Sequence, residues 1–264
     1  MANYEVLAVK YAEMDGRVRA DNFIMADDHL APMPIDYFLW VVRDGARTIV
    51  VDTGFEQVEA ERRGRRVMRH PAEALKLVGV DAASVSDVIV THLHYDHAGT
   101  LDSFTEARFH LQAAEMAFAT GPCMCQGHMR IPFTADHVCQ MVKNVYSGRV
   151  EFYDGDGEIA PGVTVHKIGG HSRGLQCVRV ATSKGPVVLA SDATHYYDNF
   201  EQGRPFPIVV DMQEVLAGYQ RIEKLAGSRR RVIPGHDPLV LKRYPAADPR
   251  LEGIAHRLDV ERRD

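Results

Sequence analysis

The stretch Thr91-His92-Leu93-His94-Tyr95-Asp96-His97-Ala98-Gly99 follows directly after the apolar run Val88-Ile89-Val90. The density of β-branched residues in that run predicts a buried strand. His92 and His94 lie two residues apart, so their side chains would leave the extended end of the strand on the same side. Asp96 and His97 are adjacent and suit a turn into a helix. Imidazole and carboxylate together are the ligand set of zinc and related transition metals. The stretch therefore predicts a metal site, in preference to histidines gathered by chance on a solvated turn.

Four further segments place ligand-type residues directly after apolar runs. They are Asp52-Thr53-Gly54, Gly169-Gly170-His171-Ser172, Ser191-Asp192-Ala193 and Pro234-Gly235-His236-Asp237. The first of them requires a tight turn, which Gly54 permits because glycine accepts positive φ. Five such motifs in one order are far more specific than any one alone. In this order they resemble the metallo-β-lactamase-fold superfamily of metal hydrolases.

The resemblance implies a fold and a set of metal ligands. The fold is expected to be α/β, a four-layer αββα sandwich formed by one domain over residues 1–264, with the site along one edge. Two Zn²⁺ ions are expected, with other divalent transition metals as alternatives. One ion would be held by His92, His94 and His171, and the other by Asp96, His97 and His236, with Asp192 bridging both. Asp52 would accept a hydrogen bond from a ligand histidine and fix its tautomer.

This ligand count leaves coordination positions open for water and substrate, which distinguishes a catalytic zinc site from a closed structural one. Two cations would lower the pKa of a bridging water enough to supply hydroxide near neutral pH. The expected activity is therefore hydrolysis. A metal-binding module without catalysis is the alternative, and a fully protein-ligated site would favour it.

Composition and charge set the limits on function. The chain has 264 residues, 45% hydrophobic and 25% charged, as is usual for a globular protein. Its net charge of −5 and pI near 6.2 give no general attraction to nucleic acid or to anionic membranes. No secretory signal or membrane-length apolar run is visible, so a cytoplasmic protein with a small-molecule substrate is expected. A homodimer is left open.

The four cysteines are expected to be free thiols in that compartment. Three of them lie in a segment rich in Met, Cys and His, which raises the alternative of a second metal site. The single-residue gap between Cys123 and Cys125 is not the spacing of structural zinc pairs, so packing or incidental thiols are preferred for these two and for Cys139. Residues 120–140 are irregular and predict a lid over a pocket or a surface excursion.

The rest of the chain alternates predicted strands and helices. Residues 35–42 and 47–51 predict a hairpin, since Asp44-Gly45 supplies the turn. Residues 4–10 predict an edge strand. Residues 71–78 predict a helix that begins at a proline, and residues 211–225 predict a longer one.

Among the hydrolases of this superfamily, the chain most resembles the small quorum-quenching N-acyl homoserine lactone lactonases. Glutathione thioesterases of the superfamily carry a helical domain after the last histidine, for which the 28 residues after His236 are too few. The implied activity is hydrolysis of a small lactone by a metal-bridging hydroxide. An esterase, a thioesterase or a phosphodiesterase on the same scaffold is the alternative.

One position departs from the lactonase pattern and bears on catalysis. Those lactonases have a tyrosine three residues after the bridging aspartate, where this chain has His195, followed by Tyr196. His195 or Tyr196 would orient the carbonyl and stabilise the oxyanion, and Asp96 would carry the proton to the leaving group. Candidate walls of the substrate pocket, all of which also suit a core position, are Phe23, Met25, Phe38, Trp40, Met129, Phe133, Tyr196 and Phe206.

Overall fold

Most strands of the larger of two β-sheets come from the N-terminal half of the chain. The computed structural model describes residues 3–25 and 29–263. In spatial order this sheet contains β13 (Ala255–Arg257), β1 (Glu5–Met14), β2 (Ile35–Arg43), β3 (Thr48–Val51), β5 (Asp87–Ile89), β6 (Arg108–Gln112) and β7 (Val150–Tyr153), with β4 (Arg66–Val67) pairing to β1. β3, β5, β6 and β7 run parallel to one another, whereas β1, β2 and β3 pair antiparallel.

The second sheet comes from the C-terminal half. Its order is β12 (Val232–Pro234), β11 (Val187–Ser191), β10 (Gln176–Val180), β9 (Val163–Lys167) and β8 (Gly157–Ala160). Only the pairing of β11 with β12 is parallel. Parallel neighbours end at the same edge, so β11 and β12 deliver Asp192 and His236 to one place.

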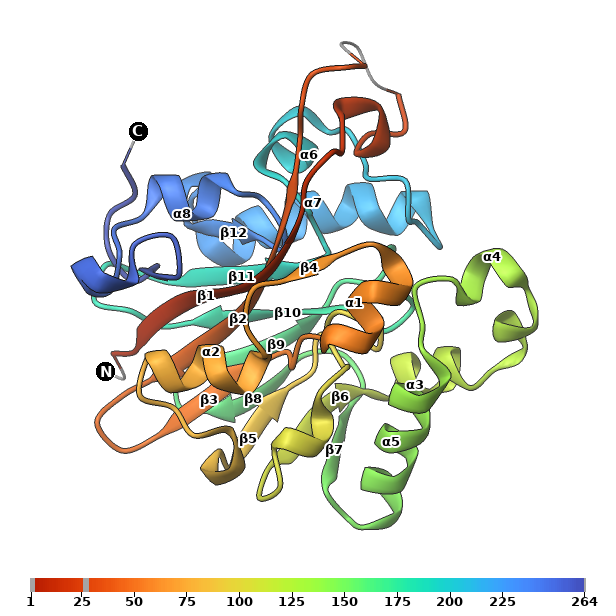
Figure 1. The fold of residues 1–264 in the computed structure, drawn as a ribbon, viewed down its shortest axis with the longest axis horizontal. Coiled ribbons are helices and arrows are strands. Elements are labelled where there is room, and N and C mark those ends of the chain that lie inside the picture. The colour runs from red at the N-terminus through yellow and green to blue at the C-terminus, as the bar shows by residue number, and fades with distance from the viewer. Residues whose placement is uncertain (1–2, 26–28, 264) are drawn as a thin grey trace.

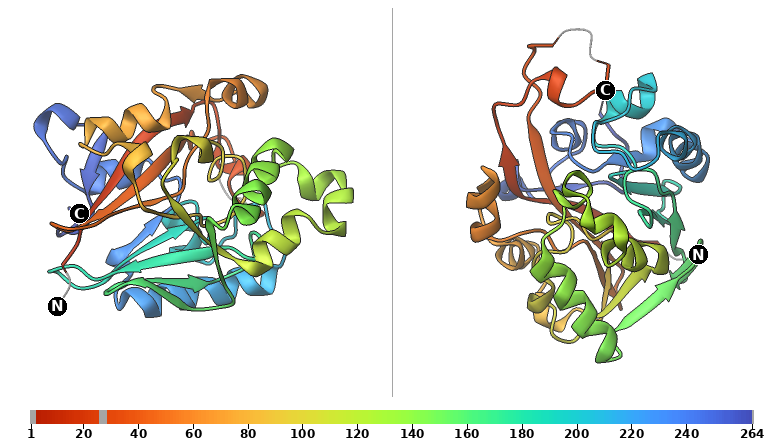
Figure 2. Two further views of the ribbon diagram at one scale, coloured as in Figure 1. Left: turned by 90° about the horizontal axis from the view of Figure 1, so that it is seen from below. Right: turned by 90° about the vertical axis from the view of Figure 1, so that its right-hand side faces the viewer.

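Helices cover the outer face of each sheet, which gives four layers (Figures 1 and 2). Strand alternation explains this arrangement: in β1, Leu7 and Val9 belong to the core under one set of helices, and Val6 and Ala8 belong to the core between the sheets. The larger sheet carries α1 (Gln57–Arg63), α2 (Pro71–Leu77), α3 (Ala113–Ala119) and α5 (Ala135–Tyr146). On the side of the smaller sheet lie α6 (Tyr197–Gln202), α7 (Met212–Ala226) and α8 (Leu239–Arg243). The expected αββα sandwich is confirmed.

Most of the predicted elements are present, and one is misplaced. Residues 35–43 and 48–51 form the expected antiparallel hairpin, and Gly54 has a φ of 73°, as the tight turn requires. The prediction of an edge strand at residues 4–10 is wrong. β1 pairs with β2 on one side and with β13 and β4 on the other. Both of these partners are too short, at three and two residues, to leave a sequence pattern.

The segment predicted as a lid or an excursion projects from one end of the sandwich with α3 and α5 (Figure 1, green). It contains a short 3₁₀ helix (Pro122–Cys125) and α4 (Gly127–Arg130). The cysteines in it, Cys123, Cys125 and Cys139, are exposed free thiols, and Cys177 is a buried one. Within the described ranges, no helix has both the length and the apolarity that crossing a bilayer requires.

Candidate metal centre

Four of the predicted ligands form one group at the strand ends. The ligand atoms of His92, His94, His171 and Asp192 all lie within 4.8 Å of one another, and all four side chains are buried. His171 Nε2 lies 3.0 Å from His94 Nδ1 and 3.2 Å from Asp192 Oδ2. His92 Nε2 lies 3.9 Å from the same carboxylate oxygen. His92 and His171 therefore face Asp192 Oδ2, and His94 lies beside His171.

The remaining three predicted ligands form a second group on the other oxygen of Asp192. His236 Nε2 is 3.0 Å and His97 Nε2 is 3.3 Å from Asp192 Oδ1. Asp96 Oδ2 lies 3.7 Å from both of these nitrogens. Asp96 is the most exposed of the seven side chains, at 10%. All seven predicted ligands thus come together, and Asp192 lies between the two groups.

Hydrogen bonding within the protein does not satisfy these buried atoms. Among the described residues, His92 Nε2, His97 Nε2 and Asp192 Oδ1 are buried without a hydrogen-bond partner, an arrangement that is costly unless another ligand is present. The chemistry of the set, imidazole nitrogen and carboxylate oxygen, fits zinc or a similar divalent transition metal. The residues present therefore fit two such ions.

The protonation of the metal-free cluster differs between the groups. Burial, together with the neighbouring histidines, lowers the pKa of His92 and of His94 well below the usual value. Burial also opposes protonation of His97 and His236, but the carboxylates, Asp192 foremost, overcome it and raise both pKa values. Metal binding requires neutral imidazole, so the second group has protons to release when an ion binds.

A hydrogen-bond network behind the ligands joins the two sheets. Asp52, at the end of β3, accepts from His97 Nδ1 at 2.7 Å, as expected, and also from the Thr91 amide at 2.7 Å and hydroxyl at 2.8 Å. Asp52 has a φ of 61°, a left-handed conformation that is uncommon outside glycine. Thr91 Oγ1 also lies 2.8 Å from Ser191 Oγ and 3.2 Å from His92 Nδ1. This network holds the ends of β3, β5 and β11 together.

Gly235 is required where the chain after β12 approaches Asp192. A Cβ at this position would lie 2.8 Å from both Asp192 Oδ1 and the Ser191 carbonyl oxygen. The Pro-Gly-His sequence thereby lets the His236 backbone pass close to the carboxylate.

Glu115 lies behind the ligands, and no sequence motif marks it. Its fully buried carboxylate accepts from the Leu93 amide at 3.0 Å, the Ser172 hydroxyl at 2.5 Å and the Gly174 amide at 2.8 Å. Burial raises the pKa of Glu115 above its usual value, and these hydrogen bonds oppose the rise. Leu93 lies between two of the predicted ligands and Ser172 follows a third. Glu115 therefore positions the first ligand group, although it lies in a helix with no motif around it.

The two residues proposed from the sequence to contact the carbonyl lie in different surroundings. His195 is buried in the cluster, with Nε2 3.0 Å from Asp192 Oδ2 and its ring stacked on Phe206 at 3.6 Å between centroids. Burial lowers the pKa of His195 to about 3, so the ring is neutral. The position of His195 also suits a metal ligand, since the ligand atoms of His195, Asp192 and His236 all lie within 4.8 Å of one another. The Tyr196 hydroxyl, by contrast, points to the carbonyl of Pro34 at 3.1 Å and of Met33 at 3.4 Å.

A small cavity of about 60 Å³ opens onto the ligands. Besides five of the predicted ligands and His195, the residues that line it are Arg17, Ile35, Tyr37, Arg65, Tyr95, Pro132, Phe206 and Ile208. Of the predicted wall residues, Phe206 therefore has the expected place. Phe38 and Trp40 belong to the core between the sheets, and Met25 is 83% exposed.

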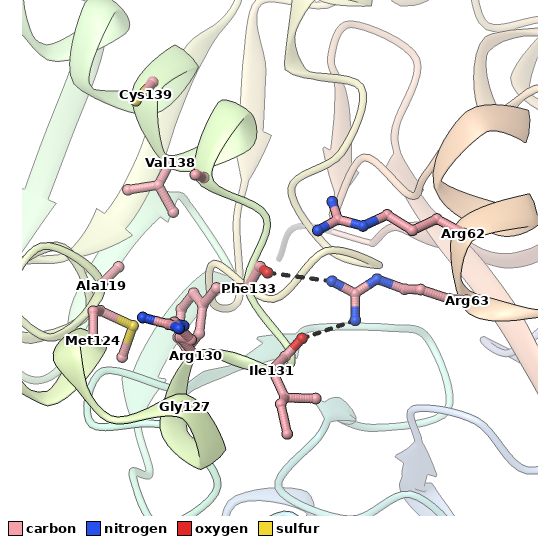
Figure 3. A pocket seen from close by; sticks show the side chains of 11 residues that line it. Arg62, Arg63, Ala119, Met124, Gly127, Arg130, Ile131, Phe133, Val138 and Cys139 are labelled. Carbon is pink, nitrogen blue, oxygen red and sulfur yellow. Dashed lines mark hydrogen bonds between the residues drawn. The ribbon is translucent and has the colours of Figure 1, made fainter.

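A second and larger cavity of about 880 Å³ lies under the projecting segment (Figure 3). Apolar side chains of this segment and the arginines Arg62, Arg63 and Arg130 line it. The Arg63 guanidinium is engaged in hydrogen bonds there, since it donates to the carbonyls of Ile131 and Phe133. Phe133 lines this cavity and also packs edge-on against His94, with 4.6 Å between ring centroids. Phe133 thus lies between the large cavity and the metal ligands.

Two mixed sheets between helical layers, with a His/Asp cluster at their shared edge, define the class of metal-dependent hydrolases. A sequence model of the metallo-beta-lactamase superfamily matches residues 36–248. The chain belongs to this superfamily, and the resemblance seen in the sequence is confirmed.

Several characterised relatives share one activity. An N-acyl homoserine lactonase from a Bacillus species is 26% identical over 234 residues, which cover 82% of this chain and 86% of the relative. The N-acyl homoserine lactonase AttM of Rhizobium johnstonii is 28% identical over 180 residues, 66% of each chain. An N-acyl homoserine lactone hydrolase solved with the product N-hexanoyl-L-homoserine at its catalytic metal center shares the fold, with a TM-score of 0.75 and 21% identity over 92% of this chain and 96% of the other.

Proposed function

We propose that the chain is a dinuclear zinc-dependent lactonase that opens a small lactone, with N-acyl homoserine lactones as the first candidates and quorum quenching as the corresponding role. The observation that carries the proposal is the arrangement of the seven ligands, in two groups on opposite oxygens of Asp192. The small cavity reaches these ligands, which supports a site open to substrate in preference to a closed structural one.

The proposed metal ligands are His92, His94 and His171 for one ion and Asp96, His97 and His236 for the other, with Asp192 shared. When bound, the ions would supply a water of lowered pKa and polarise the lactone carbonyl.

Asp96 is the proposed proton carrier. Lactone hydrolysis forms a bond from the water oxygen to the carbonyl carbon and breaks the ring C–O bond, and the water proton must reach the ring oxygen. Asp96 lines the cavity and is the most exposed ligand side chain, so its carboxylate can accept the proton and pass it on.

His195 is the proposed donor to the carbonyl oxygen. It lines the cavity, its ring is neutral, and neither ring nitrogen has a well-directed hydrogen-bond partner in the described part of the chain. The stack on Phe206 holds the ring in place. We do not assign this role to Tyr196, because its hydroxyl is already directed at the Pro34 carbonyl.

The test is an assay of zinc-loaded protein on lactones, carboxyl esters, thioesters and phosphodiesters, accompanied by metal analysis. We expect close to two zinc ions per chain and the highest kcat/KM on a lactone. Highest activity on another ester class would replace the lactonase assignment, and a protein that binds no metal would overturn the whole proposal.

We also propose that residues 120–140 form a lid over the substrate. Phe133 supports this, since it contacts His94 from within this region. Binding of an unreactive lactam, which has the lactone shape but an amide in the ring, should slow amide hydrogen exchange between residues 123 and 133. Unchanged exchange would contradict a lid.

A further inference from the structure

Two arginines line the cavity that opens onto the metal ligands, and the proposed hydrolysis uses neither of them. Arg17 lies in the loop after β1, and Arg65 lies between α1 and β4. Both side chains are half-buried. Burial raises the pKa of Tyr37 to about 12, and Arg65 and Arg17 both oppose this rise, which places the two charges around the same ring.

Arg65 is held by uncharged groups. Its Nε donates to the Tyr95 hydroxyl at 3.1 Å, and its Nη1 donates to the Arg63 carbonyl at 2.6 Å. The Tyr95 hydroxyl lies 3.1 Å from the Tyr37 hydroxyl. Tyr37 in turn packs edge-on against His236, with 5.2 Å between ring centroids. This chain of contacts fixes the guanidinium at the rim of the second ligand group.

Arg17 is also held by uncharged groups of the described residues. Its Nε donates to Asn22 Oδ1 at 2.7 Å, and its Nη2 donates to the Asp21 carbonyl. Its Cζ lies 5.4 Å from the centroid of the Phe206 ring, the same ring that stacks on His195. Arg17 and Arg65 therefore stand on different walls of one cavity.

The charge balance of this cavity is incomplete. Among the described residues, neither guanidinium has a carboxylate within ion-pair distance. The only carboxylates of the described lining are Asp96 and Asp192, and both are proposed metal ligands. Bound ions would take up their negative charge, so the two guanidinium charges would face the substrate uncompensated. Guanidinium pairs best with a planar oxyanion such as carboxylate.

We propose that Arg17 and Arg65 select lactones that carry a carboxylate near the ring, over neutral lactones. This inference rests on the proposed lactonase function and names the substrate class of the same site. Arg17 lies beside Phe206 and Arg65 beside Tyr95, so both guanidinium groups can reach an anion bound in this cavity.

Two matched pairs of substrates test the proposal. γ-Valerolactone is compared with the γ-butyrolactone that bears a carboxylate in place of the methyl group, and N-acetyl homoserine lactone is compared with its N-oxalyl analogue, which likewise bears a carboxylate in place of the methyl group. We expect the zinc-loaded protein to prefer the carboxylate member of at least one pair, mainly through a lower KM. The corresponding lactams, which are not cleaved, report affinity by titration calorimetry independently of turnover.

The variants are Arg65→Gln and Arg17→Gln, with Arg66→Gln as the matched control. Arg66 is largely exposed and pairs with Glu13 outside the cavity. Loss of one charge-assisted contact should weaken the carboxylated lactam about 10- to 100-fold and leave the neutral lactam unchanged. Arg65→Lys should recover part of the preference, since it keeps the charge and loses the planar geometry. The Arg66→Gln control should keep the full preference for the carboxylated lactam.

Equal affinity of the wild type for charged and neutral lactams would overturn the inference. So would an equal loss for both ligands in the variants, because that result would make the arginines supports for Tyr95 and the loop at Asn22. If no lactone is hydrolysed, the proposed function fails, whereas the lactam titrations still decide whether the arginines bind an anion.

Discussion

At the scale of single residues, Asp192 determines how the site is divided. Each of its oxygens faces a different set of histidines, His171 and His195 on one side and His97 and His236 on the other. Burial opposes ionisation of Asp192, but the surrounding histidines outweigh it and hold the pKa of Asp192 well below its usual value. The carboxylate is therefore ionised before any metal binds.

Substitution of His195 separates the two roles open to it. As a donor to the substrate carbonyl, His195 supplies transition-state stabilisation, so His195→Ala should lower kcat about 10²- to 10³-fold. Both metal ions should stay bound, as plasma mass spectrometry can measure. Loss of one ion would instead make His195 a metal ligand.

Tyr196→Phe is the matched comparison. In the wild type, the Tyr196 hydroxyl donates to the Pro34 carbonyl, and Tyr196 does not line the cavity. We expect near wild-type kcat and a loss of stability of about 1 kcal/mol for the hydrogen bond. A kcat that falls as far as in His195→Ala would show that this hydroxyl moves to the substrate.

Substitution of Glu115 tests how far the first ligand group depends on its support. In Glu115→Gln an amide N–H₂ replaces one of the two acceptor oxygens, so either Leu93 or the loop at Ser172 loses its partner. Zinc affinity should fall about 10- to 100-fold, as it does when residues that orient metal ligands are changed. Competition with a fluorescent chelator measures this. Glu106→Gln, an exposed glutamate, should bind zinc as the wild type does.

At the scale of elements, Asp237 joins two helices behind the site. It accepts from the first amide of α6, Tyr197, at 2.9 Å and from the Leu239 amide at the start of α8 at 2.8 Å. Burial raises its pKa from 3.8 to about 6, and these hydrogen bonds oppose the shift. Because the folded chain holds this proton more tightly than the unfolded chain, the contribution of Asp237 is fully present below about pH 4 and is lost as the pH rises through about 6.

Asp237→Asn should remove this dependence. The free energy of unfolding of metal-free wild type, relative to the variant, should decline between pH 4 and pH 7 by at most about 3 kcal/mol. Urea unfolding at several pH values measures the difference. Asp102→Asn, at an exposed position, should leave the pH profile as it is. A difference that grows with pH would reverse the sign of the assigned pKa shift.

The elements show how far sequence patterns reach. β5 and β11 are predictable because an apolar run precedes each ligand, and α7 because its apolar residues repeat with the helical period. α6 and α8, of six and five residues, are too short for any period to be visible. Their helical form comes from tertiary contacts such as that of Asp237, which no local pattern records.

At the scale of the whole molecule, the metal ions are expected to stabilise the fold because the site draws on both sheets. A ligand present at 100 times its Kd stabilises the folded chain by about 2.7 kcal/mol. Removal of zinc with a chelator should therefore lower the thermal midpoint by several degrees, and added zinc should restore it. The midpoint of Asp192→Ala should not respond to chelator. A chelator-insensitive wild type would contradict a bound pair of ions.

The whole site was predictable to the extent that its residues are adjacent in sequence. Four ligands lie within residues 92–97, and the others follow strands in a known order, so the ligand set could be read from the sequence. Arg17, Arg65 and Glu115 come from loops or helices without any motif. Only the folded chain shows that they lie beside the cluster, because the contacts that place them there are tertiary.

The hydrogen bonds around the Thr91 hydroxyl can each run in only one direction, and this has a consequence for the neighbouring histidine. The Thr91 hydroxyl has a single proton, and it donates this proton in a hydrogen bond to the Asp52 carboxylate, which can only accept. Ser191 and His92 must then both donate to Thr91 Oγ1, so the His92 proton is on Nδ1. Asp52 likewise requires a proton on Nδ1 of His97. Burial keeps the His92 imidazole neutral by lowering its pKa, so its Nε2 is left with a bare lone pair, and this atom has no hydrogen-bond partner among the described residues. One hydroxyl proton thus selects the tautomer of His92 before any cation arrives.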